Sequence, residues 1–135
     1  MSHRPCFLDP LLSRAPENLG LYIGGKAQPL AVVVEGAFDS ATRNRGLLGR
    51  TGLAPDAALV IAPCQAIHTF KMQFPIDVIY AARDGRVVKL RAAMPAARMS
   101  AAMTAFAVIE MAAGAIERSG LQVGDRLEVR STVSR

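Results

Sequence analysis

Short apolar runs, each ended within a few residues by Gly, Pro or Asp-Gly, recur along almost the whole chain. Runs of this length and composition are typical of β-strands, whereas helix signals are confined to two brief stretches. The strands do not alternate with helices, as the strands of a parallel α/β sheet would. We therefore expect a mainly β fold: a compact, antiparallel β-sandwich or barrel-like single domain with two short helices.

The signals at the ends of the runs predict the individual elements. Asp39 and Ser40 favour the start of a helix, and Gly120 favours a left-handed helix end. Asp84-Gly85 between two apolar runs is the strongest hairpin signal. Two apolar runs, Leu19–Ile23 and Leu30–Glu35, are expected to pair as the first hairpin. The expected strands are Leu19–Ile23, Leu30–Glu35, Ala58–Ala62, Thr69–Met72, Ile76–Ala82, Arg86–Ala92, Ala105–Met111 and Arg126–Arg130, and the expected helices are Ala41–Leu48 and Ala113–Ser119.

The domain organisation is simple. Residues 1–18 carry three prolines and no periodicity, so we expect an irregular N-terminal arm, followed by one β-rich domain over residues 19–132. The chain of 135 residues is 51% apolar, which is enough for one core without a disulfide or a metal. The arm lacks the continuous apolar core of a signal peptide, and no run has the length of a membrane span. A cytoplasmic location is the resulting expectation.

Charge and cysteine content restrict the function further. The net charge is +5, but the basic residues are scattered singly and are not interleaved with aromatic residues. This pattern argues against nucleic-acid binding and leaves a mild preference for anionic partners. The two cysteines, Cys6 and Cys64, are too few for a disulfide framework, although a single bridge between them stays open. Nucleotide-binding motifs of the phosphate-loop and dinucleotide types are absent.

Cys64 and His68 form the first candidate site. Cys and His four residues apart suggest either two metal ligands or a thiol–imidazole pair. On an extended strand, however, four residues span about 13 Å, so the two side chains meet only if the segment turns. A zinc site would also need ligands from the N-terminal arm, so we expect no metal and no cofactor. We favour the interpretation of Cys64 as a small buried residue, and of His68 as a structural histidine, over a functional pair.

Asp77 and Glu110 form the second candidate site, because each is an acid inside an apolar run. A buried carboxylate needs a partner, and Arg43 and Arg50 lie in the nearest arginine-rich segment. We predict Arg50–Asp77 and Arg43–Glu110 ion pairs. Such a network either fixes the fold or lines a polar pocket in which a ligand competes for the arginines.

Three segments together resemble the bacterial family known as domain of unknown function 192. They are R-x-x-G-L-L-G-R at residues 43–50, C-x-x-I-H-T-F-x-M-x-F-P-I-D at residues 64–77, and V-I-E-M-A-A-G followed by G-L-x-V-G-D-R-L. Many members carry W-M-K-N-T where this chain has the I-H-T-F form, so a role for that Trp or Asn has no counterpart here. The resemblance implies a compact β fold with the arginine segment close to the Pro-x-Asp strand, and it implies no reaction, cofactor or substrate. Since members often carry a signal peptide or lipid anchor, the cell envelope or periplasm is the alternative location if the N-terminus is truncated.

Two functional hypotheses follow. The first is a non-catalytic binding or accessory module for a small anionic molecule, a peptide or another protein, with a groove lined by Arg50, His68, Met72, Asp77 and Glu110. The second is a hydrolase- or transferase-like enzyme with Cys64 as nucleophile, His68 as base and Asp77 orienting the base. The distance between the Cys64 sulfur and the His68 ring, together with the burial of each, separates the two hypotheses.

Overall fold

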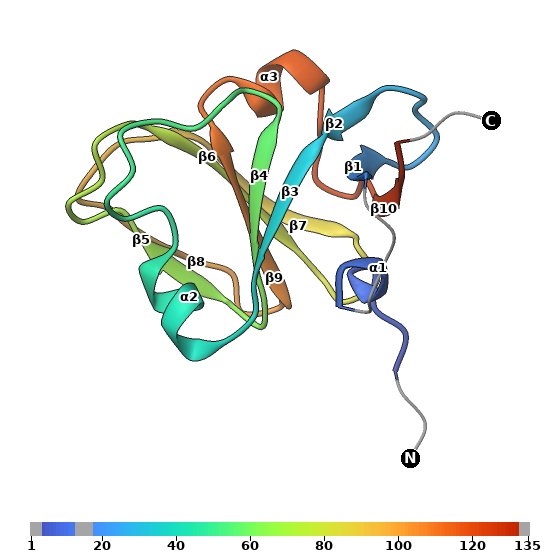
Figure 1. Ribbon diagram of the computed structural model, residues 1–135, viewed down its shortest axis with the longest axis horizontal. Helices are drawn as coiled ribbons and strands as arrows, with labels where there is room; N and C mark the ends of the chain where they lie inside the picture. Colours follow the sequence, from blue (N-terminus) through green and yellow to red (C-terminus); the bar gives the residue numbers. More distant parts are fainter. Residues whose placement is uncertain (1–3, 13–17, 133–135) are drawn as a thin grey trace.

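A five-stranded sheet runs through the middle of the molecule (Figure 1). The computed structural model describes residues 4–12 and 18–132. The order across this sheet is β3-β4-β9-β6-β7, and all neighbouring pairs are antiparallel except β3–β4, which is parallel. The strands are β3 (Val33–Ala37), β4 (Ala57–Ile61), β6 (Ile76–Ala81), β7 (Val87–Met94) and β9 (Ala107–Ala112).

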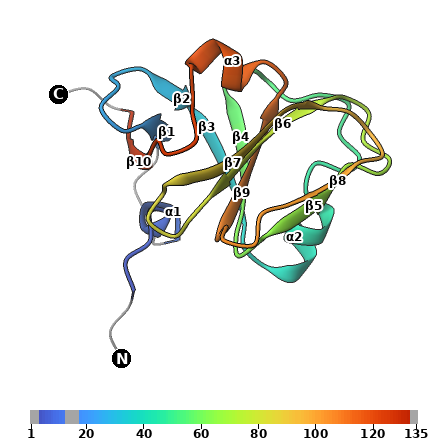
Figure 2. The same ribbon diagram turned by 180° about the vertical axis from the view of Figure 1, so that it is seen from behind.

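Two smaller sheets and two of the three helices flank the central sheet on opposite sides, and the third helix lies at one end of it (Figures 1 and 2). The three-stranded sheet β10-β1-β2 and α1 lie on one side, while α2 and the two-stranded sheet β5-β8 lie on the other. The flanking strands are β1 (Leu19–Ile23), β2 (Pro29–Ala31), β5 (Ala66–His68), β8 (Met99–Ala101) and β10 (Leu127–Ser131). The helices are α1 (Asp9–Leu12), α2 (Ser40–Arg45) and α3 (Ala115–Ser119).

The three inner strands of the central sheet, β4, β9 and β6, are buried on both faces, which explains why they are mostly apolar runs. Side chains alternate between the faces with a period of two. In β4, Ala58 and Val60 enter the core beneath the three-stranded sheet, whereas Leu59 and Ile61 enter the core beneath α2. Four side chains from a five-residue strand are therefore buried in two separate cores, and a polar residue in such a strand must lie in one of them.

The structure confirms the mainly β single domain and several of the predicted turn and helix-cap residues. The Asp84-Gly85 hairpin joins β6 to β7, and Gly120 ends α3 with φ = +71°. Asp39 caps α2 by accepting a hydrogen bond of 2.8 Å from the backbone N–H of Thr42. The described residues contain three helices rather than two, and they form several sheets with no closed barrel.

Three expectations about individual elements are wrong. The strand expected at Leu30–Glu35 is split: β2 ends at Ala31 and β3 begins at Val33, and the two strands belong to different sheets. After β3 the chain crosses back through α2 and then enters β4 in the same direction as β3. The two strands are therefore parallel rather than antiparallel. Within the N-terminal arm expected to be irregular, residues 4–12 contain α1, preceded by the fully buried Leu8, whereas residues 1–3 and 13–17 lie outside the described residues.

The third wrong expectation is the strand at Thr69–Met72, which is a turn. The Thr69 hydroxyl donates to the carbonyl of Pro95 at 2.6 Å and accepts the N–H of Arg98 at 3.0 Å. Lys71 has φ = +65°, which a strand does not accommodate. Strand β5 ends at His68, directly before this turn, and pairs with β8; neither strand was predicted from the sequence.

Across residues 4–12 and 18–132, no helix is both long enough and apolar enough to cross a membrane.

Candidate functional site

Glu110 occupies the middle of β9, and its side chain faces α2. Its cross-strand neighbours Leu59 and Val78 belong to the core beneath α2, whereas Ile109 and Met111 belong to the opposite core. Only 5% of Glu110 is exposed, and within the described residues its Oε1 atom has no hydrogen-bond partner. Burial raises the pKa of Glu110 to about 7, although the Arg50 charge acts in the opposite direction. Glu110 is therefore a buried carboxyl group whose charged form is only partly compensated.

Asp77 lies on the other face of the same sheet and is fully satisfied by backbone groups. It is 0% exposed and pairs across the sheet with Met111. Its Oδ1 accepts the N–H of Ala93 at 2.8 Å, and its Oδ2 accepts the N–H groups of Gly114 at 3.2 Å and Ile116 at 2.8 Å. Asp77 thereby joins β7 and the start of α3 to β6, and it does not line the cavity near Glu110.

Neither of the predicted ion pairs forms among the described residues. Arg50 instead makes a two-pronged bond to Glu35, with N···O distances of 2.7 and 3.2 Å, and this hydrogen bond lowers the pKa of Glu35. Arg43 donates long hydrogen bonds to the Phe38 carbonyl at 3.5 Å and the Ser40 hydroxyl at 3.4 Å. The two arginines thus stabilise the segment around α2, and Glu110 has no direct cationic partner within residues 4–12 and 18–132.

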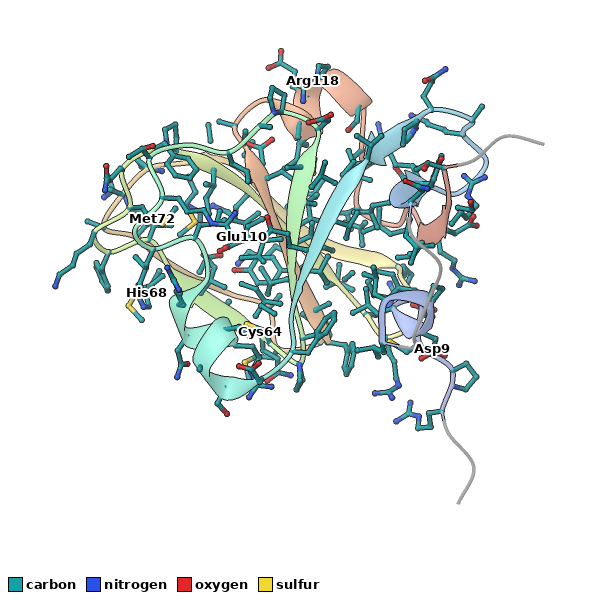
Figure 3. The ribbon with its side chains drawn as sticks, in the orientation of Figure 1. Asp9, Cys64, His68, Met72, Glu110 and Arg118 are labelled. Atoms are coloured by element: carbon teal, nitrogen blue, oxygen red, sulfur yellow. The ribbon has the colours of Figure 1, made fainter. Side chains whose placement is uncertain are left out.

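A cavity of about 400 Å³ opens between Glu110, α2 and β5. Figure 3 shows Glu110, His68, Met72 and Cys64 on the side of the sheet that carries α2, far from Arg118 and Asp9. Of the groove residues predicted from sequence, His68, Met72 and Glu110 line this cavity, whereas Arg50 and Asp77 do not. We name it the Glu110 pocket. Its polar side chains are Arg43, Asn44, Arg45, Cys64, His68 and Glu110, and its apolar side chains are those of Leu47, Leu48, Ile61, Pro63, Ala66, Ile67 and Met72.

Gly46 keeps the space above the Glu110 carboxyl group open. It ends α2 with φ = +50° and ψ = −127°, a conformation that residues with a Cβ rarely adopt. A Cβ atom built on Gly46 would lie 3.5 Å from the unpartnered Glu110 oxygen. Gly46 and Arg45 were not predicted as site residues, although both lie in the R-x-x-G-L-L-G-R segment that carries part of the family resemblance.

Cys64 and His68 share the pocket but do not form a hydrogen-bonded pair in the described structure. The Cys64 Sγ donates to the carbonyl of Ala66 at 3.2 Å, and the His68 ring stacks on Phe70 with centroids 5.2 Å apart. Burial raises the pKa of the Cys64 thiol, and the nearby Glu110 acts in the same direction. Because the thiolate is the nucleophilic form, this environment opposes the Cys64–His68–Asp77 enzyme hypothesis. Asp77 is moreover on the opposite face of the sheet and cannot orient His68.

We expect Cys64 to react slowly with iodoacetamide at neutral pH. Its alkylation should be several-fold slower than that of an unstructured cysteine peptide, because the raised thiol pKa lowers the thiolate fraction. Mass spectrometry of the digested protein separates Cys64 from Cys6. The substitution Glu110→Gln should speed alkylation of Cys64, since it removes a charge that disfavours the thiolate. Alkylation faster than that of the peptide would instead indicate an activated thiol.

The part of the chain that the structure describes contains no cluster of three or more His, Cys, Asp or Glu side chains able to hold a metal ion.

Two solved structures share this fold over most of their length. A protein of unknown function from Novosphingobium aromaticivorans DSM 12444 is 25% identical with a TM-score of 0.71, and the match covers 81% of this chain and 83% of that one. The crystal structure of a "putative transcription regulator" from Sinorhizobium meliloti 1021 is 24% identical with a TM-score of 0.72, and the match covers 83% of this chain and 92% of that one. The second likeness is one of fold alone.

Comparison by sequence finds a family for the chain but no curated relative. None of the curated proteins matches the chain. Residues 22–129 match the model of the family DUF192, described as "Uncharacterized ACR". This match spans most of the chain and includes all three segments that carry the resemblance seen in the sequence. The chain therefore belongs to the DUF192 family of uncharacterised proteins.

Proposed function

We propose that this protein is a non-catalytic binding module that holds a small anionic or peptide ligand in the Glu110 pocket. The observation that carries the proposal is the Glu110 Oε1 atom, which is buried, faces the pocket and has no hydrogen-bond partner within the described residues. An unsatisfied buried polar group costs about 1–3 kcal/mol, and more when it is charged. A ligand that donates a hydrogen bond to this atom would recover that free energy on binding.

The composition of the pocket also supports the proposal. Its volume of about 400 Å³ lies within the range of small-molecule sites, which combine apolar walls with a few polar groups. Arg43 and Arg45 come from α2, where their charges would attract an anionic group of the ligand. Arg50, also predicted from sequence to line the groove, does not line this pocket, and its guanidinium is paired with Glu35.

A thermal-shift screen tests the proposal. The probes are inorganic phosphate, small dicarboxylates, free amino acids and short peptides, each added to the wild-type protein and to Arg43→Gln. We expect at least one probe to raise the melting temperature of the wild-type protein, because a ligand that binds only the folded state stabilises it. The shift should shrink in Arg43→Gln, which loses a cation of the pocket.

The matched control is Arg126→Gln, which removes an arginine paired with Asp84 and outside the Glu110 pocket. This variant should keep the full wild-type shift. Equal shifts in all three proteins would place the ligand elsewhere, and the absence of a shift with every probe would count against this ligand class.

A further inference from the structure

The Glu110 pocket places two opposite kinds of polar group around one apolar space. At the floor, the Glu110 carboxyl group offers an oxygen that lacks a partner among the described residues. On the α2 side, Arg43 and Arg45 offer cationic donors. Leu47, Ile67 and other apolar side chains line the space between them. A ligand that satisfies all three features has a donor group at one point, an anionic group at another, and an apolar part between or beside them.

Resting on the proposed function, we infer that the ligand is a zwitterionic α-amino acid or a short peptide, with its ammonium group at Glu110 and its carboxylate near Arg43 and Arg45. The alternative ligand classes fit less well. An anion without an O–H or N–H group has no donor for Glu110, and any anion would repel the charged form of this carboxyl group. A neutral apolar ligand would bury the same carboxyl group without a partner.

The charged and titratable groups around Glu110 are consistent with this orientation of the ligand. They come from α2 and the segment after it, from the loop after β4, from β5 and from β6. These groups are Arg43, Arg45, Arg50, Cys64, His68 and Tyr80. The cations lie on α2 and the segment after it, so the Glu110 carboxyl group is the acceptor available to an ammonium group within this set.

Ammonium binding should change the protonation of Glu110. Its pKa of about 7 means that the carboxyl group is largely protonated at pH 6 when the pocket is empty. A bound ammonium favours the charged carboxylate and lowers this pKa, so binding should release close to one proton at pH 6. Affinity should accordingly rise between pH 6 and pH 8. A ligand that only contacts the arginines would release no such proton.

Isothermal titration calorimetry in two buffers of different ionisation enthalpy measures both affinity and proton release. The probes are the standard amino acids and dipeptides, each compared with its N-acetylated form and its carboxamide form. We expect the zwitterion to bind about tenfold or more tightly than either derivative, because each derivative loses one charge-assisted contact. Glu110→Gln should lose a similar factor together with the proton release, and Arg126→Gln should bind as the wild-type protein does.

A pocket-filling variant separates failure of this inference from failure of the proposed function. Ala66 is exposed and lines the pocket, so Ala66→Trp should reduce binding of any ligand held there. If phosphate or a dicarboxylate binds in an Ala66-dependent way while zwitterions do not, the binding module stands and the amino-acid class is wrong. If zwitterions bind to Ala66→Trp and to Glu110→Gln as tightly as they bind to the wild-type protein, both proposals are overturned. Binding without proton release at pH 6 contradicts the placement of the ammonium group at Glu110.

Discussion

Replacing Asp77 with Ala should lower the free energy of unfolding by about 3 kcal/mol or more, since three N–H groups would lose their acceptor. Those donors belong to Ala93, Gly114 and Ile116, at distances of 2.8–3.2 Å from the carboxylate. Each unpaired buried donor costs about 1–3 kcal/mol, and small domains have only about 5–15 kcal/mol in total. The loss is therefore a large part of the stability of the domain.

The local geometry makes substitution of Asp77 especially costly. The β6–β7 pairing shifts in register between Ile76 and Val78, opposite the segment that contains Ala93. Ala93 has φ = +48° at this irregularity, and Asp77 accepts the N–H that the shifted ladder leaves free. The same carboxylate holds the beginning of α3, where Gly114 has no side-chain cap of its own. One side chain thus fixes a strand irregularity and a helix start at once.

Urea denaturation followed by far-ultraviolet circular dichroism measures the effect. Asp77→Asn, which keeps one carbonyl oxygen but points an amide group at N–H donors, should lose somewhat less stability than Asp77→Ala. The control Asp84→Ala removes an exposed acid that bonds to Arg126 and to the N–H of Arg86, and should change stability by about 1 kcal/mol or less. A loss at Asp77 no larger than that at Asp84 would show that the three backbone bonds contribute little.

Asp77 and Glu110 also show how far sequence reasoning reaches in this fold. The apolar context of each acid predicts burial, and both are buried. The face on which each side chain lies depends on strand order and register, which pair Val78 with Glu110 and Asp77 with Met111. These pairings join residues 32 and 34 positions apart in the chain, so no local pattern indicates them. The two acids lie on opposite faces, and one arginine segment cannot serve both.

The same distinction between local and distant contacts explains the elements that were predicted well. The Asp84-Gly85 turn and the left-handed Gly120 are set by backbone preferences of a few neighbouring residues. The division of the expected strand at Leu30–Glu35 into β2 and β3 is set instead by a change of sheet. Strands β5 and β8 have only three residues each and depend on one another for their hydrogen bonds. Sequence therefore predicts the class of fold and much of its local structure, but only part of the pocket.

Raising the pH from about 5 to about 8 should lower the stability of the empty wild-type protein through Glu110 by about 3 kcal/mol. The folded state holds the Glu110 proton up to a pKa of about 7, whereas the usual value for glutamate is 4.5. Between these values the folded state binds more protons than the unfolded state, so stability falls as pH rises. This loss of stability has not begun below about pH 4, where Glu110 is protonated in both the folded and the unfolded state. It is complete above about pH 8.

Glu110→Gln isolates this contribution, because the amide does not titrate while the other groups remain. Relative to the wild-type value, the free energy of unfolding of Glu110→Gln should rise by about 3 kcal/mol from pH 5 to pH 8. Urea denaturation at several pH values measures it, and the exposed Glu117→Gln should follow the wild-type pH dependence. A constant difference for Glu110→Gln would mean that water or a neighbouring cation compensates the Glu110 charge in solution. The unpartnered oxygen would then no longer favour a ligand in the pocket, so this measurement also tests the basis of the proposed function.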